Sequence, residues 1–313
     1  MKTIFIGTAD LARVTLEALA SASGIELVGV VTQPDRPQGR NLQLLPSPVK
    51  KAALNLHLPI FQPLKARDPA FHQIIAGLSP ELIIVAAYGQ ILPQAILDLP
   101  KFGCLNVHAS LLPKYRGAAP IQWAILDDEP VTGVTIMKMD AGLDTGAILT
   151  QQSTRIEAED NGKTLHDRLA ILGARLLLET IPGYVGGRIS PLPQPVEGAS
   201  YARKIVKADG QIQWHHTARR IWNQIRAFNP WPGSFSKLGR EPATRLLKIW
   251  RASENKLESG RPGLVLRAGR EDIVVACGQN ALNIEELQLE GGKRLSSREF
   301  LAGHVIPEGT QLS

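Results

Sequence analysis

Cysteine is scarce in this chain of 313 residues, which contains only Cys104 and Cys277, far apart and each within an apolar run. A disulfide framework needs more cysteines than that, so the sequence favours two buried free thiols in a reducing compartment. Apolar runs such as residues 82–88 are far shorter than the roughly 18 residues that a membrane-spanning helix needs. The chain begins directly with a strand-like segment, with no basic leader followed by an apolar stretch. We therefore expect a cytoplasmic protein without membrane association.

Signatures of nucleotide and metal binding are also missing. Gly7 follows the first predicted strand, where a dinucleotide fingerprint begins, but the second and third glycines of that fingerprint are absent. No P-loop sequence occurs, and no cluster of His, Cys and Asp has the spacing of a metal site. We therefore expect neither a nucleotide cofactor nor a metal.

Basic residues concentrate toward the C-terminus of a chain whose formal net charge is +6. Residues 1–206 contain 19 Lys and Arg against 18 Asp and Glu, whereas residues 207–313 contain 16 against 11. Between Asp209 and Glu254 the only acidic residue is Glu241. Such a one-sided region can bind a polyanion by releasing its counterions, although a merely solvated basic surface would have the same composition.

Predicted strands and helices alternate through the N-terminal part of the chain. The strand patterns cover residues 2–7, 26–32, 81–89, 101–109 and 131–139, and the helical patterns cover residues 10–20, 48–56, 119–126 and 164–181. This alternation is typical of an α/β fold with a mostly parallel, Rossmann-like sheet that helices cover on both faces. Pro182 and Gly183 should end the last of these helices.

The composition changes after that helix, where glycines and three prolines predict an extended linker over residues 188–206. Beyond it, a helical pattern at residues 215–228 precedes short strand patterns at residues 245–252, 263–267, 273–277 and 282–289. Ser296 and Glu299 have the spacing of a capping box and should begin a short last helix. We therefore expect an α/β domain over residues 1–187 and a small β-rich barrel or sheet over residues 207–313.

A polar pair ends the predicted strand at residues 101–109. Asn106 and His108 are two residues apart, so a strand places both side chains on one face, at the end where open α/β sheets form their sites. An amide donor beside an imidazole can bind an oxyanion and exchange a proton. A hydrogen-bonded histidine at a polar strand end is the alternative interpretation.

A second polar loop follows the predicted strand at residues 131–139. It contains Asp140 and Asp144 with two glycines, and one of its two acids could reach the first pair. A carboxylate beside His108 would favour the charged imidazole and fix its tautomer. Local backbone bonding within the turn is the alternative role for these aspartates.

Together these segments resemble the folate-dependent formyltransferases over nearly the whole chain. The family signatures are similar to residues 106–113 (NVHASLLP), 115–121 (YRGAAPI) and 140–146 (DAGLDTG). Residues 33–37 (QPDRP), 46–50 (PSPVK) and 227–232 (AFNPWP) resemble the branch that acts on methionyl-tRNA. The resemblance implies that Asn106, His108 and Asp144 are catalytic and that 10-formyltetrahydrofolate, as co-substrate, gives its formyl group to methionine on initiator tRNA.

The resemblance also implies where both substrates bind. The folate would pack against Ser110, Leu111, Leu112 and Pro113, near Tyr88, Gly89, Gln90, Ile91 and Leu92. The second domain would be an OB-like β-barrel that supports tRNA binding, and the loop at residues 33–47 would reach the tRNA acceptor end. We expect a monomer whose tRNA contacts are Arg36, Arg40, Arg219, Arg220, Lys237 and Lys248. The sequence departs from the family after Arg40, where Asn41-Leu42-Gln43 replace the glycine and two lysines of many members.

Two other functions stay open at this point. A formyltransferase for a small amine, such as an amino sugar or a purine precursor, would share the Asn–His–Asp signature but lack the basic second domain. A catalytically silent RNA-binding protein would use the basic domain but would not need the triad.

Overall fold

A computed structural model describes residues 1–38, 43–239, 244–269 and 272–313, and its internal contacts divide the chain into two compact units. Unit 1 comprises residues 1–120, 131–155 and 166–203, and unit 2 comprises residues 121–130, 156–165 and 204–313. The linker expected at residues 188–206 thus groups almost entirely with unit 1, to which it hydrogen-bonds at Leu192, Gln194 and Ser200–Ala202. Two short stretches of the predicted α/β domain, residues 121–130 and 156–165, group with unit 2.

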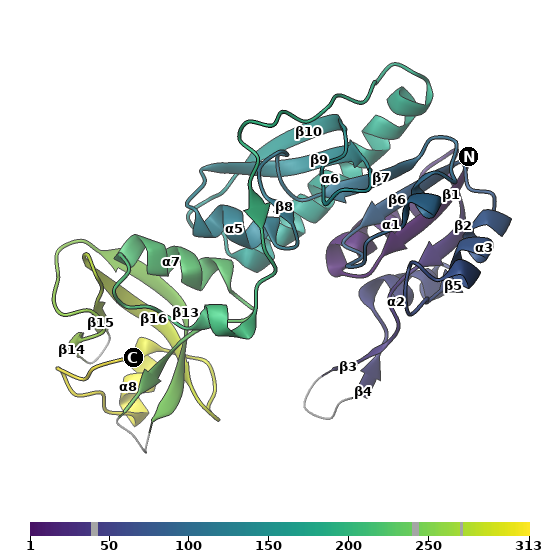
Figure 1. Cartoon of the computed structure of the whole chain (residues 1–313). Coiled ribbons are helices and arrows are strands. Elements are labelled where there is room, and N and C mark those ends of the chain that lie inside the picture. Colours follow the sequence, from purple (N-terminus) through teal and green to yellow (C-terminus); the bar gives the residue numbers. More distant parts are fainter. Residues whose placement is uncertain (39–42, 240–243, 270–271) are drawn as a thin grey trace. The chain divides into compact units, whose positions relative to one another are not determined.

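Unit 1 is built on a seven-stranded sheet in the order β10-β9-β7-β6-β1-β2-β5 (Figure 1). The five strands from β7 to β5 pair in parallel, whereas β9 and β10 are antiparallel, so the predicted mostly parallel, Rossmann-like sheet is confirmed. The strands of unit 1 are β1 (Lys2–Gly7), β2 (Glu26–Val31), β3 (Arg36–Gln38), β4 (Gln43–Leu45), β5 (Ile60–Phe61), β6 (Leu82–Ala86), β7 (Cys104–His108), β8 (Arg116–Gly117), β9 (Val131–Lys138), β10 (Ile148–Arg155) and β11 (Tyr201–Ala202).

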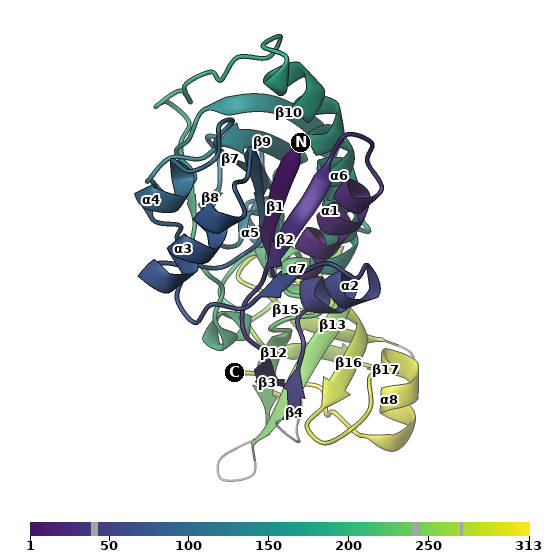
Figure 2. The same cartoon turned by 90° about the vertical axis from the view of Figure 1, so that its right-hand side faces the viewer.

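Helices cover both faces of this sheet, with α3 and α4 on one side and α1 on the other (Figure 2). Ile4 and Ile6 of β1 and Cys104 of β7 belong to the buried cluster that α3 and α4 cover. Burying each large apolar side chain contributes roughly 1.5–3 kcal/mol. No helix in the described part of the chain has the length and apolar character needed to cross a membrane. The helices of unit 1 are α1 (Asp10–Ala20), α2 (Pro48–Asn55), α3 (Pro69–Gly77), α4 (Gln94–Leu97) and α6 (Gly162–Val185), whose first turn groups with unit 2; α5 (Pro120–Leu126) groups with unit 2 from its second residue on.

Helix α6 ends later than the sequence predicted. Pro182 and Gly183 were expected to end it, but the helix continues through both to Val185, so that prediction was wrong. Proline removes one backbone N–H and crowds the preceding turn, which a helix tolerates more easily in its last turn than in its middle. The left-handed residue that follows the helix is Gly187, with a φ of +74°.

Unit 2 is an antiparallel β-rich unit with strand order β12-β13-β16-β15-β14, and β17 pairs with β16. Helix α7 lies on the sheet, and its Ile221 and Ile225 join the buried core. The helix begins at Ala218 because the Thr217 hydroxyl caps it. The predicted capping box of Ser296 and Glu299 is confirmed. The elements are η1 (Lys207–Gly210), α7 (Ala218–Ala227), β12 (Ser234–Leu238), β13 (Arg245–Asn255), β14 (Val265–Ala268), β15 (Ile273–Ala276), β16 (Ala281–Leu289), β17 (Leu295–Ser296) and α8 (Ser297–Gly303).

The two cysteines are buried free thiols, as the sequence predicted. Burial raises the pKa of both the Cys104 and the Cys277 thiol to about 12. A thiol that stays protonated is a poor nucleophile, so both residues serve packing.

The loop between β9 and β10 has no room for a side chain at Gly146. A Cβ atom there would lie 1.9 Å from the carbonyl oxygen of Lys138. We therefore predict that Gly146→Ala lowers the free energy of unfolding by about 1–3 kcal/mol, measured by urea denaturation. The matched control is Gly77→Ala in α3, where a Cβ would meet nothing within 4 Å. That change should be neutral or stabilising by up to about 1 kcal/mol. Equal stability of the two variants would contradict the steric argument.

Candidate active site

Strand β7 presents Asn106 and His108 at its carboxyl end. Cys104 lies in the buried cluster of unit 1, and the residues two and four positions later point to the same face of the sheet. Both side chains are largely buried, with exposed fractions of 9% for Asn106 and 5% for His108. The strand therefore brings the amide and the imidazole together, as its alternation predicted.

Asp144 joins this pair from the loop between β9 and β10. Its Oδ1 accepts a hydrogen bond from Asn106 Nδ2 at 3.4 Å, and its Oδ2 lies 3.7 Å from His108 Nδ1. The backbone N–H of Gly117 donates to the same Oδ2 at 2.8 Å. The carboxylate therefore faces both side chains of β7 and is anchored by a third segment of the chain.

Asp140, the other acid of the loop, serves the turn itself. Its Oδ1 accepts from the Gly142 N–H at 3.0 Å and from the Thr145 hydroxyl at 2.7 Å. The two interpretations of the loop thus apply to different residues. Asp140 bonds locally within the turn, whereas Asp144 contacts the pair of Asn106 and His108.

A backbone carbonyl fixes the tautomer of His108. Its Nε2 lies 2.9 Å from the carbonyl oxygen of Tyr115. A carbonyl oxygen only accepts hydrogen bonds, so Nε2 carries a proton, and Nδ1 is the ring nitrogen that faces Asp144. The sequence had assigned this role to a carboxylate, but the Tyr115 carbonyl performs it.

Two residues of the site have left-handed backbones, with φ of +60° at Tyr115 and +53° at Asp144. This conformation costs roughly 1–2 kcal/mol for a residue with a side chain, and it persists only where surrounding contacts hold it. The Ser200 hydroxyl accepts the Tyr115 N–H at 2.9 Å, and the Gly117 bond holds Asp144. Neighbouring segments therefore maintain the backbone that aims the two groups.

The first predicted folate segment, Ser110–Pro113, is held by polar side chains of β9 and β10. The Thr135 hydroxyl donates to the Ser110 carbonyl at 2.7 Å and accepts the Leu112 N–H at 3.1 Å. Gln151 Nε2 donates to the Leu112 carbonyl at 2.8 Å. Thr135 and Gln151 were not predicted as part of the site from the sequence. The one available signal was a threonine within an apolar strand.

The second predicted folate segment, residues 88–92, divides between the core and the surface. The side chains of Tyr88 and Leu92 lie in the buried cluster of unit 1, and burial raises the pKa of the Tyr88 hydroxyl to about 12. The Gln90 side chain accepts the Ala66 N–H at 2.8 Å. Gly89 takes a left-handed φ of +81°, and Ile91 is 77% exposed. Ile91 is therefore the member of this segment that offers an exposed apolar side chain.

Two of the arginines predicted to contact tRNA are paired with acids inside unit 2. Arg219 Nη2 lies 2.8 Å from Asp128 Oδ1, and this contact lowers the pKa of the Asp128 carboxyl. Arg220 lies 3.4 Å from Asp127 and donates to the Leu126 carbonyl. Both guanidinium groups therefore hold the 121–130 segment within unit 2.

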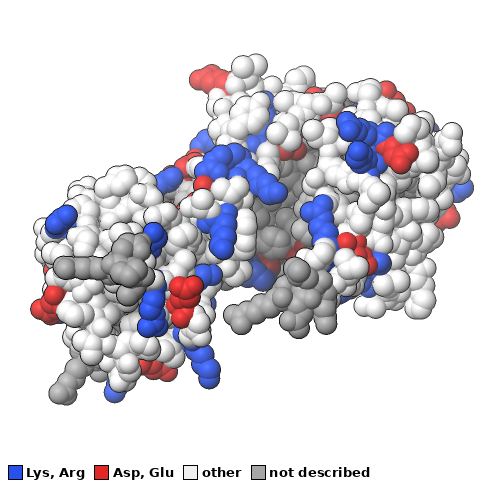
Figure 3. Space-filling view, turned by 60° about the horizontal axis from the view of Figure 1, so that its bottom comes forward, with Lys and Arg blue, Asp and Glu red and all other residues white. Residues whose placement is uncertain are grey.

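The two predicted lysines are placed differently. Phe235 pairs with Lys248, and Lys237 pairs with Leu246, so both lysines lie on one face of the β12–β13 ladder. Neither forms an ion pair with an acid among the described residues. Lys248 Nζ lies 5.2 Å from the centre of the Trp250 ring. Figure 3 shows exposed lysine and arginine side chains with acidic side chains among them.

The remaining predicted tRNA contacts lie in the 33–47 loop of unit 1. Arg36 donates to the Gln33 side chain, and Lys50 Nζ holds the neighbouring Asp35 at 2.7 Å. These bonds fix the base of the β3–β4 hairpin. Arg40 lies outside the described residues.

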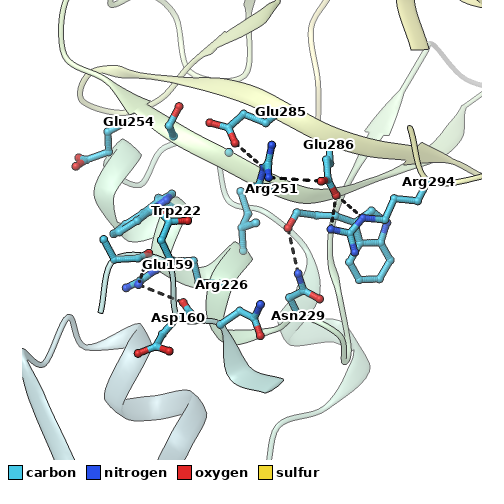
Figure 4. A pocket seen from close by; sticks show the side chains of 16 residues that line it. Glu159, Asp160, Trp222, Arg226, Asn229, Arg251, Glu254, Glu285, Glu286 and Arg294 are labelled. Atoms are coloured by element: carbon cyan, nitrogen blue, oxygen red, sulfur yellow. Dashed lines mark hydrogen bonds and ion pairs between the residues drawn. The ribbon is translucent and has the colours of Figure 1, made fainter. Parts of the chain in front are cut away.

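A groove of about 410 Å³ lies within unit 2 (Figure 4). It is lined by five acidic side chains against three arginines, which leaves an excess of two negative charges: Glu159, Asp160, Glu254, Glu285 and Glu286 against Arg226, Arg251 and Arg294. Arg251 Nε also bonds Glu285 at 2.7 Å. This balance disfavours a phosphate-bearing ligand in the groove.

Solved structures share the fold of the chain. One is an N-formyltransferase from Helicobacter canadensis in complex with folinic acid and dTDP-3-aminofucose, with a TM-score of 0.68, 19% identity, and coverage of 94% of this chain and 100% of that one. Another is HypX from Aquifex aeolicus in complex with tetrahydrofolic acid, with a TM-score of 0.62 and 16% identity. That match covers 96% of this chain but 47% of HypX, so the chain spans about half the length of HypX. At these identities the likeness concerns the fold alone.

Sequence comparison gives a closer relationship. A formyl transferase family model matches residues 1–181, and a model of the formyl transferase C-terminal domain matches residues 204–305. The methionyl-tRNA formyltransferase of Pelotomaculum thermopropionicum is 48% identical over 100% of this chain and 98% of its own length. That of Citrifermentans bemidjiense is 49% identical over 99% of this chain and 95% of its own length. The chain therefore belongs to the methionyl-tRNA formyltransferase family.

Proposed function

We propose that this chain transfers the formyl group of 10-formyltetrahydrofolate to the α-amine of methionine on initiator methionyl-tRNA, for translation initiation in the cytoplasm. The observation that carries the proposal is the meeting of Asn106, His108 and Asp144 at the end of β7. Relatives of the same length that bear the name of this activity support the choice of substrates. The monomeric state stays a prediction.

Asn106 is suited to stabilise the charge that forms on the formyl oxygen. The neutral amine attacks the formyl carbon, a C–N bond forms, and the carbonyl electron pair moves to oxygen. One N–H of Asn106 Nδ2 faces Asp144 at 3.4 Å, and the amide has a second N–H to donate to that oxygen. One such donor typically contributes on the order of 10²–10³ in rate.

His108 and Asp144 are suited to move the proton. The amine loses a proton as it attacks, and the folate nitrogen must gain one as its bond to the formyl carbon breaks and the carbonyl re-forms. Nε2 of His108 is occupied by the Tyr115 carbonyl, so Nδ1, 3.7 Å from Asp144, is the nitrogen that can exchange the proton. The carboxylate stabilises the positive charge on the ring meanwhile. Such general acid–base catalysis contributes roughly 10²–10⁴.

For tRNA, we propose that Lys237 and Lys248 contribute more phosphate contact than Arg219 and Arg220. The two lysines have no acidic partner among the described residues, whereas Asp128 and Asp127 offset the charge of the arginines. Lys248 also lies beside Trp250, and a basic group next to an aromatic ring suits a nucleic acid. The contribution of Arg36 and Arg40 stays a prediction.

The decisive assay incubates the protein with 10-formyltetrahydrofolate and charged initiator tRNA and measures N-formylmethionine. A dTDP-linked amino sugar is offered in parallel, since it represents the small-amine alternative. If the sugar is formylated and the methionyl-tRNA is not, the proposal is overturned.

We predict that Asn106→Ala, His108→Ala and Asp144→Asn each lower the single-turnover rate by about 10²-fold or more. The first removes a hydrogen-bond donor, the second a proton carrier and the third a negative charge. Asp144→Asn keeps an oxygen for the Gly117 N–H, removes the charge and replaces the oxygen that accepts from Asn106 with an NH2 group. The matched control is Asp140→Asn, which keeps the acceptor oxygen of the turn and should stay within a few-fold of wild type. Near wild-type rates in all three folded variants would sink the assignment.

We predict that Lys237→Ala/Lys248→Ala raises the KM for tRNA and reduces the slope of log KM against log salt by about 1–2, because about one counterion is released for each phosphate contact. The kcat at saturating tRNA should not change. Lys256→Ala, an exposed lysine just beyond the opposite end of β13, serves as the control. An unchanged salt slope in the double variant would exclude the lysine face as a tRNA contact.

A further inference from the structure

The extended segment that leads from unit 1 into unit 2 is bound to unit 1 at three places. Leu192 exchanges two backbone hydrogen bonds with Ile148, both at 2.8 Å. The backbone of Ser200 bonds Arg116 and Pro113, and β11 pairs in parallel with β8. Between these two anchors Gln194 forms the third attachment. From Ser190 to Ala199 it is the one residue that is not exposed.

Every hydrogen-bonding position of the Gln194 amide is used. Its Nε2 donates to the carbonyl oxygens of Asp144 at 2.9 Å and Gly146 at 2.7 Å. Its Oε1 accepts from Arg116 Nε at 3.0 Å and Nη2 at 2.7 Å. Carbonyls only accept and a guanidinium only donates, so the orientation of the amide is unambiguous.

We propose that Gln194 is a positioning residue for formyl transfer, which holds the backbone of Asp144 against the turn that contains Gly117. The inference rests on the proposed function. Gln194 binds the backbone of Asp144 on one side and Arg116 on the other, and the next residue, Gly117, donates its N–H to the Asp144 carboxylate at 2.8 Å. One side chain therefore sets the separation of the two chain segments that aim this carboxylate.

The backbone at Asp144 requires such support. Its φ of +53° is a left-handed conformation that a residue with a side chain adopts only where surrounding contacts hold it. Gly146 packs closely against the backbone of Lys138, where an added Cβ would lie 1.9 Å from the carbonyl oxygen, so we expect the loop to relax away from that strand. Without the two donors of Gln194, the carbonyls of Asp144 and Gly146 lose the partners that oppose this movement, and Asp144 moves away from His108.

The test uses the full-length protein and steady-state formylation of methionyl-tRNA. Gln194→Glu keeps the size of the side chain and the acceptor for Arg116 but removes both donors and sets a carboxylate oxygen against two carbonyls. We expect kcat to fall about tenfold to a hundredfold, the effect of a displacement of about 1 Å at a catalytic group. The KM values for both substrates should change less than kcat, because Gln194 contacts neither segment predicted to bind folate. Gln194→Leu, which lacks donors and acceptor alike, is the second variant if the charge prevents folding.

A second measurement does not depend on activity. The amide proton of Gly117, observed by ¹H–¹⁵N NMR, should shift upfield in Gln194→Glu as its bond to Asp144 lengthens. Val196→Ala, at a residue of the same segment that is 92% exposed, should leave both kcat and this signal unchanged.

The outcomes separate the two proposals. A wild-type protein that does not formylate methionyl-tRNA overturns the proposed function. If the wild type is active and the kcat of Gln194→Glu stays within about threefold of the wild-type value, the proposed role of Gln194 is overturned, whereas the proposed function is not. A lower kcat without a change at Gly117 also overturns it, because the loss would then not act through the Asp144 turn. A lower kcat with a shifted Gly117 signal supports it.

Discussion

The hydrogen bond from the Gly117 N–H to the Asp144 carboxylate joins the parts of the site that come from different segments of the chain. Asn106 and His108 are fixed by β7, which is buried within the sheet and cannot move independently. Asp144 has no such support, because it lies in a loop and has a left-handed backbone. The Gly117 bond brings its carboxylate to the strand and so completes the arrangement of amide, imidazole and acid.

Backbone groups perform much of the positioning in this site. The Tyr115 carbonyl fixes the ring of His108, and two residues later the Gly117 N–H fixes Asp144. The same short turn therefore sets the orientation of both the imidazole and the carboxylate. The extended segment braces this turn through Ser200 and Gln194, although its composition is that of a linker.

The basic composition of unit 2 has two different uses. Arg219 and Arg220 are paired with Asp128 and Asp127 and tie the 121–130 segment into the unit. Lys237 and Lys248 have no such partners among the described residues and lie together on the β12–β13 face. Net charge counted along the sequence therefore overestimates the charge available to a polyanion, because part of it is neutralised inside the unit.

The sequence by itself determined the α/β class, the position of β7 and the common face of Asn106 and His108, because buried parallel strands are continuously apolar and side chains alternate along any strand. It missed β10, whose Gln151, Gln152 and Ser153 interrupt the apolar pattern, and it placed the end of α6 too early. The chemistry of the loop left Asp140 and Asp144 open, and the family resemblance chose Asp144, which the structure places against Asn106 and His108. Only the tertiary structure decided the roles of Tyr115, Gly117 and Gln194. A carbonyl or an N–H is present at almost every residue, so its use depends on which segments the fold brings together, and the sequence has no local signal for that.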